Sequence, residues 1–371
     1  MKATFDREKF ANAFQMAAAV APSRSPKPIL SNVKLEVADD QAIVMATDLE
    51  LGMRAVVAGV KVDVPGSCVL PIQRFGSILR ESSDAQIHIE TDGHGTTARG
   101  ERSEFKLPAA NPDEFPAVAA FAEKAYYEIP AKLMRELIRR TVFATDNESS
   151  RYALGGVLLE MQGNQIIAVG TDGRRLAKME GTGNSVGGHQ TGDQTTIIPT
   201  RAMQIIERLL ADGDAEVQLA ARSNDVLVKT AKATIYSRLV EGRFPRWRDV
   251  FPRRDDAKKI EMIVGPFYAA VRQAQITTSE ESRGVDFSFG EGKVVLVARA
   301  ADVGQSRVEL PIGYDGPTVS IMLDPRYMAD FLRVLDPEKT FTIELKDAES
   351  AAVCSTDDGY GYVIMPLARD H

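Results

Sequence analysis

One helical phrase occurs three times in this chain, and its spacing restricts the possible folds more than any other feature. The copies read VLPIQRFGSILRES, IIPTRAMQIIERLL and IMLDPRYMADFLRVL. They align on Pro71, Pro199 and Asp324, so they begin 128 and 125 residues apart. Solenoid repeats have periods of roughly 20 to 50 residues. The longer period found here predicts duplicated domains.

Each copy has the pattern of an amphipathic helix that starts at its proline or aspartate, two residue types suited to a helix start. Four and seven residues after this origin stand apolar side chains: Phe75, Ile78, Met203, Ile206, Met328 and Phe331. Two and nine residues after it stand mostly arginines: Gln73, Arg80, Arg201, Arg208, Arg326 and Arg333. At about 100° per residue the two sets lie on opposite faces. We therefore predict helices with one buried face and one cationic face.

A second helical pattern precedes each copy, in KFANAFQMAAAV, KLMRELIRRTVF and PFYAAVRQAQIT. Between the helices, apolar and polar residues alternate, as in NVKLEV, AQIHIE and KVVLVARA. This alternation is typical of half-buried antiparallel strands. We predict an α+β fold of three similar domains, each with two helices packed on antiparallel sheets. The expected boundaries are 1–124, 125–256 and 257–371.

Positive charge is concentrated on the six predicted helices, although the whole chain has a formal net charge of −7. The helices carry thirteen basic and five acidic residues. For a single helix, arginine on a solvated face is a sufficient explanation. The same asymmetry in all six helices favours contact with phosphates. No aromatic residues alternate with these arginines to stack bases, so we expect duplex DNA to be bound, without sequence preference.

Other features exclude several classes of protein. No apolar run approaches the ~20 residues of a membrane helix, and the first residues lack the apolar core of a signal peptide. Cys68 and Cys354 have no metal-ligand spacing. We therefore expect a cytoplasmic protein that needs no metal or cofactor and does not contact membranes. A DNA-processing enzyme or a monomeric peptide-binding scaffold remains as an alternative.

Longer motifs, ordered along the whole chain, resemble the bacterial DNA polymerase III beta subunits, the beta sliding clamps. They include RSPKPIL near residue 24, TDLELGMRA at 47, SSRYALGGVLLE at 149, VGTDGRRLA at 169, RLVEGRFPRW at 238 and YVIMPL near the end. The resemblance implies a non-catalytic processivity factor whose head-to-tail homodimer forms a DNA clamp, a ring with helices lining the hole. The implied partners are double-stranded DNA, the replicative DNA polymerase catalytic subunit, the clamp loader, and other replication and repair proteins that carry a clamp-binding motif.

Helix dimensions support two chains for each ring. Six helices of ~10 Å diameter, standing side by side, leave a hole of ~9 Å, whereas twelve leave ~28 Å. A duplex with grooves of about 8 Å depth needs the larger hole. Two chains must then meet head to tail. By resemblance, Phe105 and Leu107 of the first domain meet Ile276 and Thr277 of the third.

The resemblance also assigns two sets of binding residues. Arg24, Tyr152 and Arg201 match DNA-contacting positions, and they join Arg80, Arg208 and Arg333 from the helix pattern. A peptide-binding groove between the second and third domains would bury the apolar anchors of partner peptides, with Arg175 donating to peptide carbonyls. Its residues are Leu154, Thr171, Gly173, Arg174, Arg175, Leu176, Pro245, Val250, Tyr327, Val363, Ile364, Met365, Pro366 and Leu367.

Overall fold

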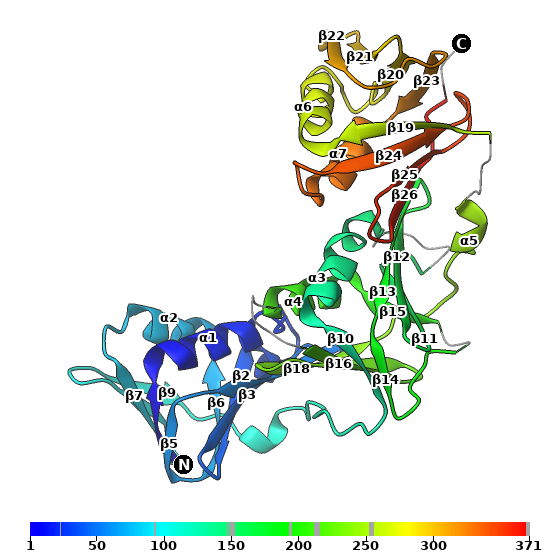
Figure 1. Ribbon diagram of the computed structural model, residues 1–371. Helices are drawn as coiled ribbons and strands as arrows, with labels where there is room; N and C mark the ends of the chain where they lie inside the picture. The colour runs from blue at the N-terminus through cyan, green and yellow to red at the C-terminus, as the bar shows by residue number, and fades with distance from the viewer. Residues whose placement is uncertain are drawn as a thin grey trace. The chain divides into compact units, whose positions relative to one another are not determined.

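The computed structural model describes residues 1–22, 24–92, 94–146, 148, 153–192, 195–210, 216–251 and 256–368. Contacts divide the chain into two compact units, and Figure 1 labels most of their helices and strands. The first unit comprises Met1–Met134, Gly183–Gln190 and Arg201–Leu239, and the second comprises Arg135–Thr182, Thr191–Thr200 and Val240–His371. The predicted second domain therefore contributes to both units.

Two helices of the first unit, α1 (Arg7–Ala18) and α2 (Ile72–Glu81), bury their apolar faces against each other. Asp6 caps α1 by accepting a hydrogen bond from Lys9 N at 3.0 Å. The Phe75 ring lies 5.4 Å from that of Phe10 and 5.2 Å from that of Phe14. All three rings are fully buried. The apolar face predicted for this pair is confirmed as core.

The first unit holds two antiparallel sheets. The five-stranded sheet has the order β5 (Val60–Val64), β1 (Lys2–Asp6), β7 (Gln86–Thr91), β8 (Gly95–Arg99), β9 (Glu104–Pro108). The nine-stranded sheet has the order β14 (Asn184–Val186), β10 (Tyr126–Pro130), β16 (Glu216–Ala221), β17 (Asp225–Lys229), β18 (Ala233–Arg238), β4 (Leu51–Val57), β3 (Gln41–Thr47), β2 (Asn32–Ala38), β6 (Gly66–Pro71). Because β18 pairs with β4, this sheet runs across the expected boundary near residue 124.

The second unit is built in the same way. Its eight-stranded sheet has the order β15 (Thr196–Pro199), β11 (Gly156–Gln162), β12 (Gln165–Thr171), β13 (Arg175–Thr182), β26 (Tyr360–Ile364), β25 (Ala352–Ser355), β24 (Thr340–Leu345), β19 (Lys258–Ile263). Its four-stranded sheet has the order β22 (Gly304–Pro311), β21 (Lys293–Ala300), β20 (Val285–Gly290), β23 (Val319–Leu323). The β13–β26 pair crosses the boundary expected near residue 256.

Helices α6 (Val264–Gln275) and α7 (Pro325–Arg333) pack together in the second unit, and the single turn α5 (Trp247–Val250) follows β18 in the chain. Asp324 caps α7 by accepting from Arg326 N at 3.0 Å. Phe331 and Met328 are fully buried, and the Phe331 ring stacks on that of Tyr362 at 5.1 Å. The remaining helices are α3 (Ala131–Arg139) and α4 (Thr200–Leu209), with short 3-10 turns at Pro28–Ser31, Pro112–Glu114 and Val142–Ala144. The predicted α+β fold class is confirmed.

Candidate functional site

A tight turn between β12 and β13 fixes the direction of two arginines. Thr171 Oγ1 accepts a hydrogen bond from Gly173 N at 3.1 Å and donates one to Arg175 O at 2.6 Å. Asp172 Oδ1 accepts from the backbone N–H groups of Arg174 and Arg175, at 2.9 and 3.0 Å. Gly173 has a φ of +85°, a region that glycine occupies without Cβ strain. The short Thr-Asp-Gly-Arg-Arg sequence thus determines this turn locally.

Strand β13 continues from the turn and pairs with β26, a strand almost 190 residues further along the chain. The register places Leu176 opposite Val363. Beyond the last ladder pair, Met365 N donates to Arg174 O at 2.9 Å. Leu176 and Val363 are buried, whereas Met365 is 45% exposed. The pairing therefore leaves an accessible apolar side chain beside the arginine turn.

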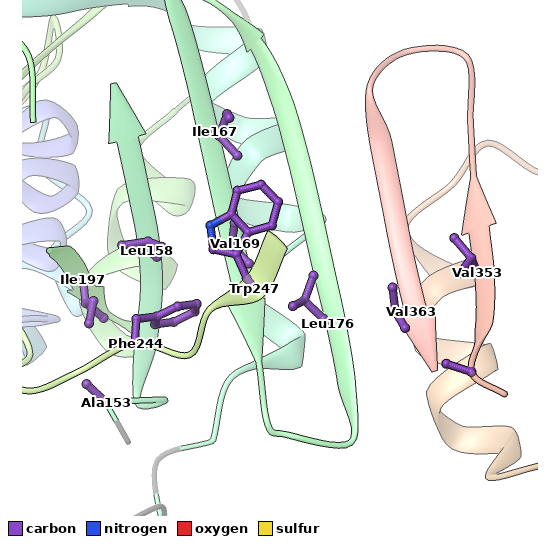
Figure 2. Packing of buried hydrophobic residues seen from close by; sticks show 11 residues of the cluster. Ala153, Leu158, Ile167, Val169, Leu176, Ile197, Phe244, Trp247, Val353 and Val363 are labelled. Carbon is purple, nitrogen blue, oxygen red and sulfur yellow. The ribbon is translucent and has the colours of Figure 1, made fainter. Parts of the chain in front are cut away.

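The segment after Phe244 is anchored to the same sheet (Figure 2). Phe244 and Trp247 belong to a buried cluster whose other members are Ala153, Leu158, Ile167, Val169, Leu176, Ile197, Ala351, Val353 and Val363. Trp247 Nε1 donates to Glu160 Oε1 at 3.1 Å, and the Arg248 guanidinium pairs with the same carboxylate at 2.6 Å. Val250, at the end of α5, stays 40% exposed. The segment therefore presents Val250 from a fixed backbone.

Arg175 lies at the centre of a polar network. It donates to Asp172 Oδ2 at 3.0 Å, to Asp330 Oδ2 at 2.7 Å and to Phe143 O at 2.8 Å. Its guanidinium carbon lies 4.5 Å from the centre of the Tyr327 ring. Burial lowers the pKa of this guanidinium, but the Tyr362 hydroxyl and the carboxylates of Asp330 and Asp172 raise the pKa by more, above its ordinary value. Each of its three nitrogens thus already donates a hydrogen bond within the protein.

A cavity of about 760 Å³ opens between the turn, α7 and the segment after β26. Its lining includes Arg174, Met322, Asp324, Tyr327, Met365 and Leu367. Leu367 N donates to Met322 O at 2.9 Å, which fixes the segment after β26 along β23. Because Glu281, Arg283, Asp286 and Arg299 also line it, the cavity combines apolar side chains with charged groups of both signs.

All fourteen residues that the resemblance assigns to a groove lie in the second unit. They come from the turn, the β13–β26 pair and the segment that follows β26, the segment after Phe244, the loop before β11, and α7. The sequence reasoning did not include Glu160, Trp247, Arg248 and Asp330, although these side chains position the groove residues. The only tryptophan of the chain, directly after Phe-Pro-Arg, was the available signal for Trp247.

The arginines proposed from the helix pattern occupy exposed helix faces in the first unit. Arg80 on α2 is 64% exposed and pairs with the neighbouring Glu81 at 3.0 Å. Arg208 on α4 is exposed and forms no ion pair within the described ranges. Arg201 pairs with Asp48 and donates to Val20 O at 2.8 Å. Two of these arginines are thus held by acidic neighbours that an anionic ligand must compete with.

The remaining residues expected to contact DNA lie elsewhere. Arg24 is exposed in the loop after α1. Arg333, in the second unit, is 60% exposed and pairs with Asp330 Oδ1 at 3.0 Å. Tyr152 lies outside the described residues.

The residues expected at the seam between chains lie at or near strands that form sheet edges. Strand β9 ends the five-stranded sheet, with Phe105 38% exposed and Leu107 buried. In the second unit, Ile276 follows α6 and is 75% exposed. Thr277 Oγ1 donates a hydrogen bond of 2.8 Å to Ser306 Oγ of the edge strand β22. Within the described ranges each of these strands has a neighbour on one side only, so its outer backbone groups could bond an additional strand.

Comparison with known proteins covers nearly the whole chain. Residues 1–119, 128–246 and 248–368 match the family models of the N-terminal, central and C-terminal domains of the DNA polymerase III beta subunit. This chain belongs to the family of DNA polymerase III beta subunits, the beta sliding clamps. It is 28% identical to the Beta sliding clamp of Chlamydia muridarum over 368 residues, which is 99% of both chains. It is 29% identical to that of Escherichia coli strain K12 over 377 residues, with 99% of this chain and all of the relative covered.

Solved structures of clamps are similar along the whole length. The DNA polymerase III subunit beta of Pseudomonas aeruginosa has a TM-score of 0.89 at 28% identity, with both chains fully covered. A sliding clamp of the same organism, bound to griselimycin, has a TM-score of 0.92 at 27% identity, again with full coverage of both. As a member of this family, the chain is a DNA polymerase sliding clamp and a processivity subunit without catalytic activity.

The described ranges contain neither a cluster of metal ligands nor a membrane-spanning helix. No group of three or more His, Cys, Asp or Glu side chains there could hold a metal ion. No helix in the described part of the chain is long and apolar enough to span a membrane.

Proposed function

We propose that two copies of this chain close head to tail around duplex DNA and tether partner proteins through the groove of the second unit. The β13–β26 pairing carries the proposal for the groove, because it aligns Arg174 with Met365 on a fixed backbone. A short peptide gains affinity here by burying apolar anchors in a preformed slot. Exposed Val250 and Met365 offer contact area for such anchors.

The partners that fit this groove are those of a replication clamp. We assign to it the replicative DNA polymerase catalytic subunit, the clamp loader, and other proteins with a clamp-binding motif. Double-stranded DNA in the cytoplasm is the nucleic-acid partner. The fourteen groove residues named above are the proposed contacts for these peptides.

The seam between the two copies is assigned to Phe105 and Leu107 of one chain and to Ile276 and Thr277 of its partner. Sheet-edge addition gives backbone hydrogen bonds, and the exposed Phe105 and Ile276 add apolar burial. This interface is heterologous and closes after two copies. We further divide the chain into domains 1–124, 125–256 and 257–371. The family matches to 1–119, 128–246 and 248–368 support these boundaries.

DNA contact is assigned to Arg24, Arg80, Tyr152, Arg201, Arg208 and Arg333. Because a ring retains DNA by topology, individual phosphate contacts can stay weak. Binding should then be indifferent to base sequence and sensitive to salt.

The test compares linear and circular DNA after loading. We expect the clamp to leave linear DNA as salt is raised, and to persist on a nicked circle until that circle is cut. The variant Arg80→Gln, Arg208→Gln, Arg333→Gln should bind linear DNA more weakly, with a shallower slope against log salt. Equal loss from circular and linear DNA at the same salt concentration would show that retention is not topological.

A further inference from the structure

The arginine turn beside the groove has a close structural copy in the first unit, 124 residues earlier. Thr47 Oγ1 accepts from Leu49 N at 2.9 Å and donates to Leu51 O at 2.8 Å. Asp48 Oδ1 accepts from the N–H groups of Glu50 and Leu51, at 3.0 and 2.7 Å. Leu49 has a φ of +81°, close to that of the glycine at the corresponding place, although leucine rarely adopts it. The two turns therefore share one hydrogen-bond pattern.

The strands that follow the two turns also correspond. Strand β4 pairs with β18, and the register places Gly52 opposite Tyr236. Beyond the last ladder pair, Arg238 N donates to Glu50 O at 2.8 Å, as Met365 N does to the second turn. Tyr236 thus stands where the groove has Val363. The first unit repeats the backbone of the groove with different side chains.

A connecting segment completes the correspondence. Phe115 and Val118 are buried against Met45, as Phe244 and Trp247 are buried in the second unit. Gly52 allows this approach, since a Cβ there would come within 2.9 Å of Val118 Cγ1. Between these elements lies a cavity of about 400 Å³, lined by the turn, by residues 116–119 and by Tyr236, with Arg222 and Asp225.

The lining segment 116–119 has free backbone groups. It belongs to no helix or strand, and within the described residues it forms no backbone–backbone hydrogen bond. Among the described residues, its one polar contact is made by Val118 O, which accepts from Arg54 Nη1 at 3.2 Å. Ala117 is exposed. Free backbone groups beside a pocket can hydrogen-bond an extended peptide, as a sheet edge does when a peptide adds to it.

The polar groups of the cavity indicate the anchor that it would accept. The Tyr236 hydroxyl has no hydrogen-bond partner in the part of the chain that the structure describes. Arg222 is held by Asp225 and by Glu123 at 3.3 Å, so its charge is already balanced. The side chains of Leu49 and Val118 form an apolar part of the cavity wall. A neutral side chain with an aliphatic stem and a hydrogen-bonding end, such as glutamine, matches this lining.

We propose that the cavity between the Thr47–Leu51 turn, residues 116–119 and Tyr236 is a second peptide-binding site, which takes an extended segment anchored by a glutamine-like side chain. The inference rests on the proposed function of the corresponding groove in the second unit. It adds a site with a different anchor preference, so one clamp chain would hold two kinds of peptide.

Disulfide capture tests the proposal on the full chain. Ala117→Cys places a thiol at the cavity, and Arg246→Cys places one at the corresponding position of the groove segment. Cys68 and Cys354 do not interfere, because both are buried and burial raises the pKa of both thiols, that of Cys68 to about 12. The probes are acetylated tetrapeptides with a cysteamine disulfide at the C-terminus and glutamine, leucine, glutamate or glycine at one position. Captured peptide is quantified by intact mass under 2-mercaptoethanol.

We expect Ala117→Cys to capture the glutamine peptide about tenfold better than the glycine or glutamate peptide, and Arg246→Cys to capture the leucine peptide best. Adding Tyr236→Phe, which keeps the ring, should reduce the glutamine preference about fivefold. If Ala117→Cys captures the four peptides equally, or captures the leucine peptide better than the glutamine peptide, the proposal of a second site is overturned. If only Arg246→Cys captures the four peptides equally, the proposed placement of the groove in the second unit fails while the second site stands. The two failures can therefore be distinguished.

Discussion

The two turns that begin at Thr47 and Thr171 have the same backbone and differ in what their side chains hold. The second turn carries Arg175, whose side chain is only 10% exposed and which is tied to two carboxylates. The first carries Leu51 at the corresponding place, and Asp48 instead pairs with Arg201, whose side chain is 50% exposed. A common hydrogen-bond pattern thus fixes the shape of both sites. Burial and charge at a few positions decide how firmly each is held.

The largest difference should appear when the turn aspartates are removed. Asp172→Ala deletes two turn hydrogen bonds and leaves the buried Arg175 with one carboxylate, so we expect the free energy of unfolding to fall by about 3 kcal/mol. Asp48→Ala also deletes two turn hydrogen bonds, but its ionic partner is exposed, so about 1 kcal/mol is expected. Urea denaturation followed by circular dichroism measures both. Equal losses would mean that the burial of Arg175 adds nothing.

The next effect concerns peptide affinity. Met365→Ala with Pro366→Ala removes apolar surface from the groove, and we expect a polymerase-derived peptide to bind about 100-fold more weakly. Arg238→Ala is the matched control, because Arg238 occupies the position of Met365 at the first turn and should leave this peptide unaffected. Calorimetric titration gives both affinities. Unchanged peptide affinity in the double variant would show that the peptide does not bind at Met365 and Pro366.

A smaller effect is expected from the carboxylate that anchors the segment after Phe244. Glu160→Ala removes the partner of both Trp247 Nε1 and Arg248, so Val250 is held less firmly and the peptide should bind about fivefold more weakly. The first unit has no tryptophan, so the fluorescence of Trp247 reports on the groove alone. Glu160→Gln keeps one acceptor oxygen and should restore part of the affinity. If added salt fully restored the peptide affinity of Glu160→Ala, the loss would be due to the missing charge of Glu160 and not to a displaced segment.

The smallest effect is a dependence of folding stability on pH, caused by His189 in the first unit. His189 Nε2 accepts from Ala221 N at 3.1 Å, next to Arg222 of the cavity wall, and burial lowers the pKa of this histidine although Glu123 opposes the shift. The unfolded chain therefore binds the proton more readily than the folded chain does. Stability should be constant above about pH 6.5 and should fall as the pH drops through the lowered folded pKa. His189→Gln should flatten this part of the profile measured by thermal unfolding; an identical slope would assign it to other groups.

The helices and their buried faces could be predicted from the sequence because helix periodicity is local. Phe75, Met203 and Met328 were placed on the core side by spacing alone, and all three are fully buried. The arginine turn was recognised as a motif, yet its partner Asp330 was not, since an ion pair across 155 residues leaves no trace in local pattern. Glu160 and Trp247, 87 residues apart, were missed for the same reason.

By itself, the sequence determined the threefold repeat, the α+β elements and the concentration of arginine on helices, because each depends on spacing within one segment. Only the tertiary structure decided that β18 joins β4 and that β13 joins β26, so that two related turns each acquire a pocket. Strand pairing between distant segments depends on which edges meet and which side chains are buried there. Those are properties of the folded chain as a whole.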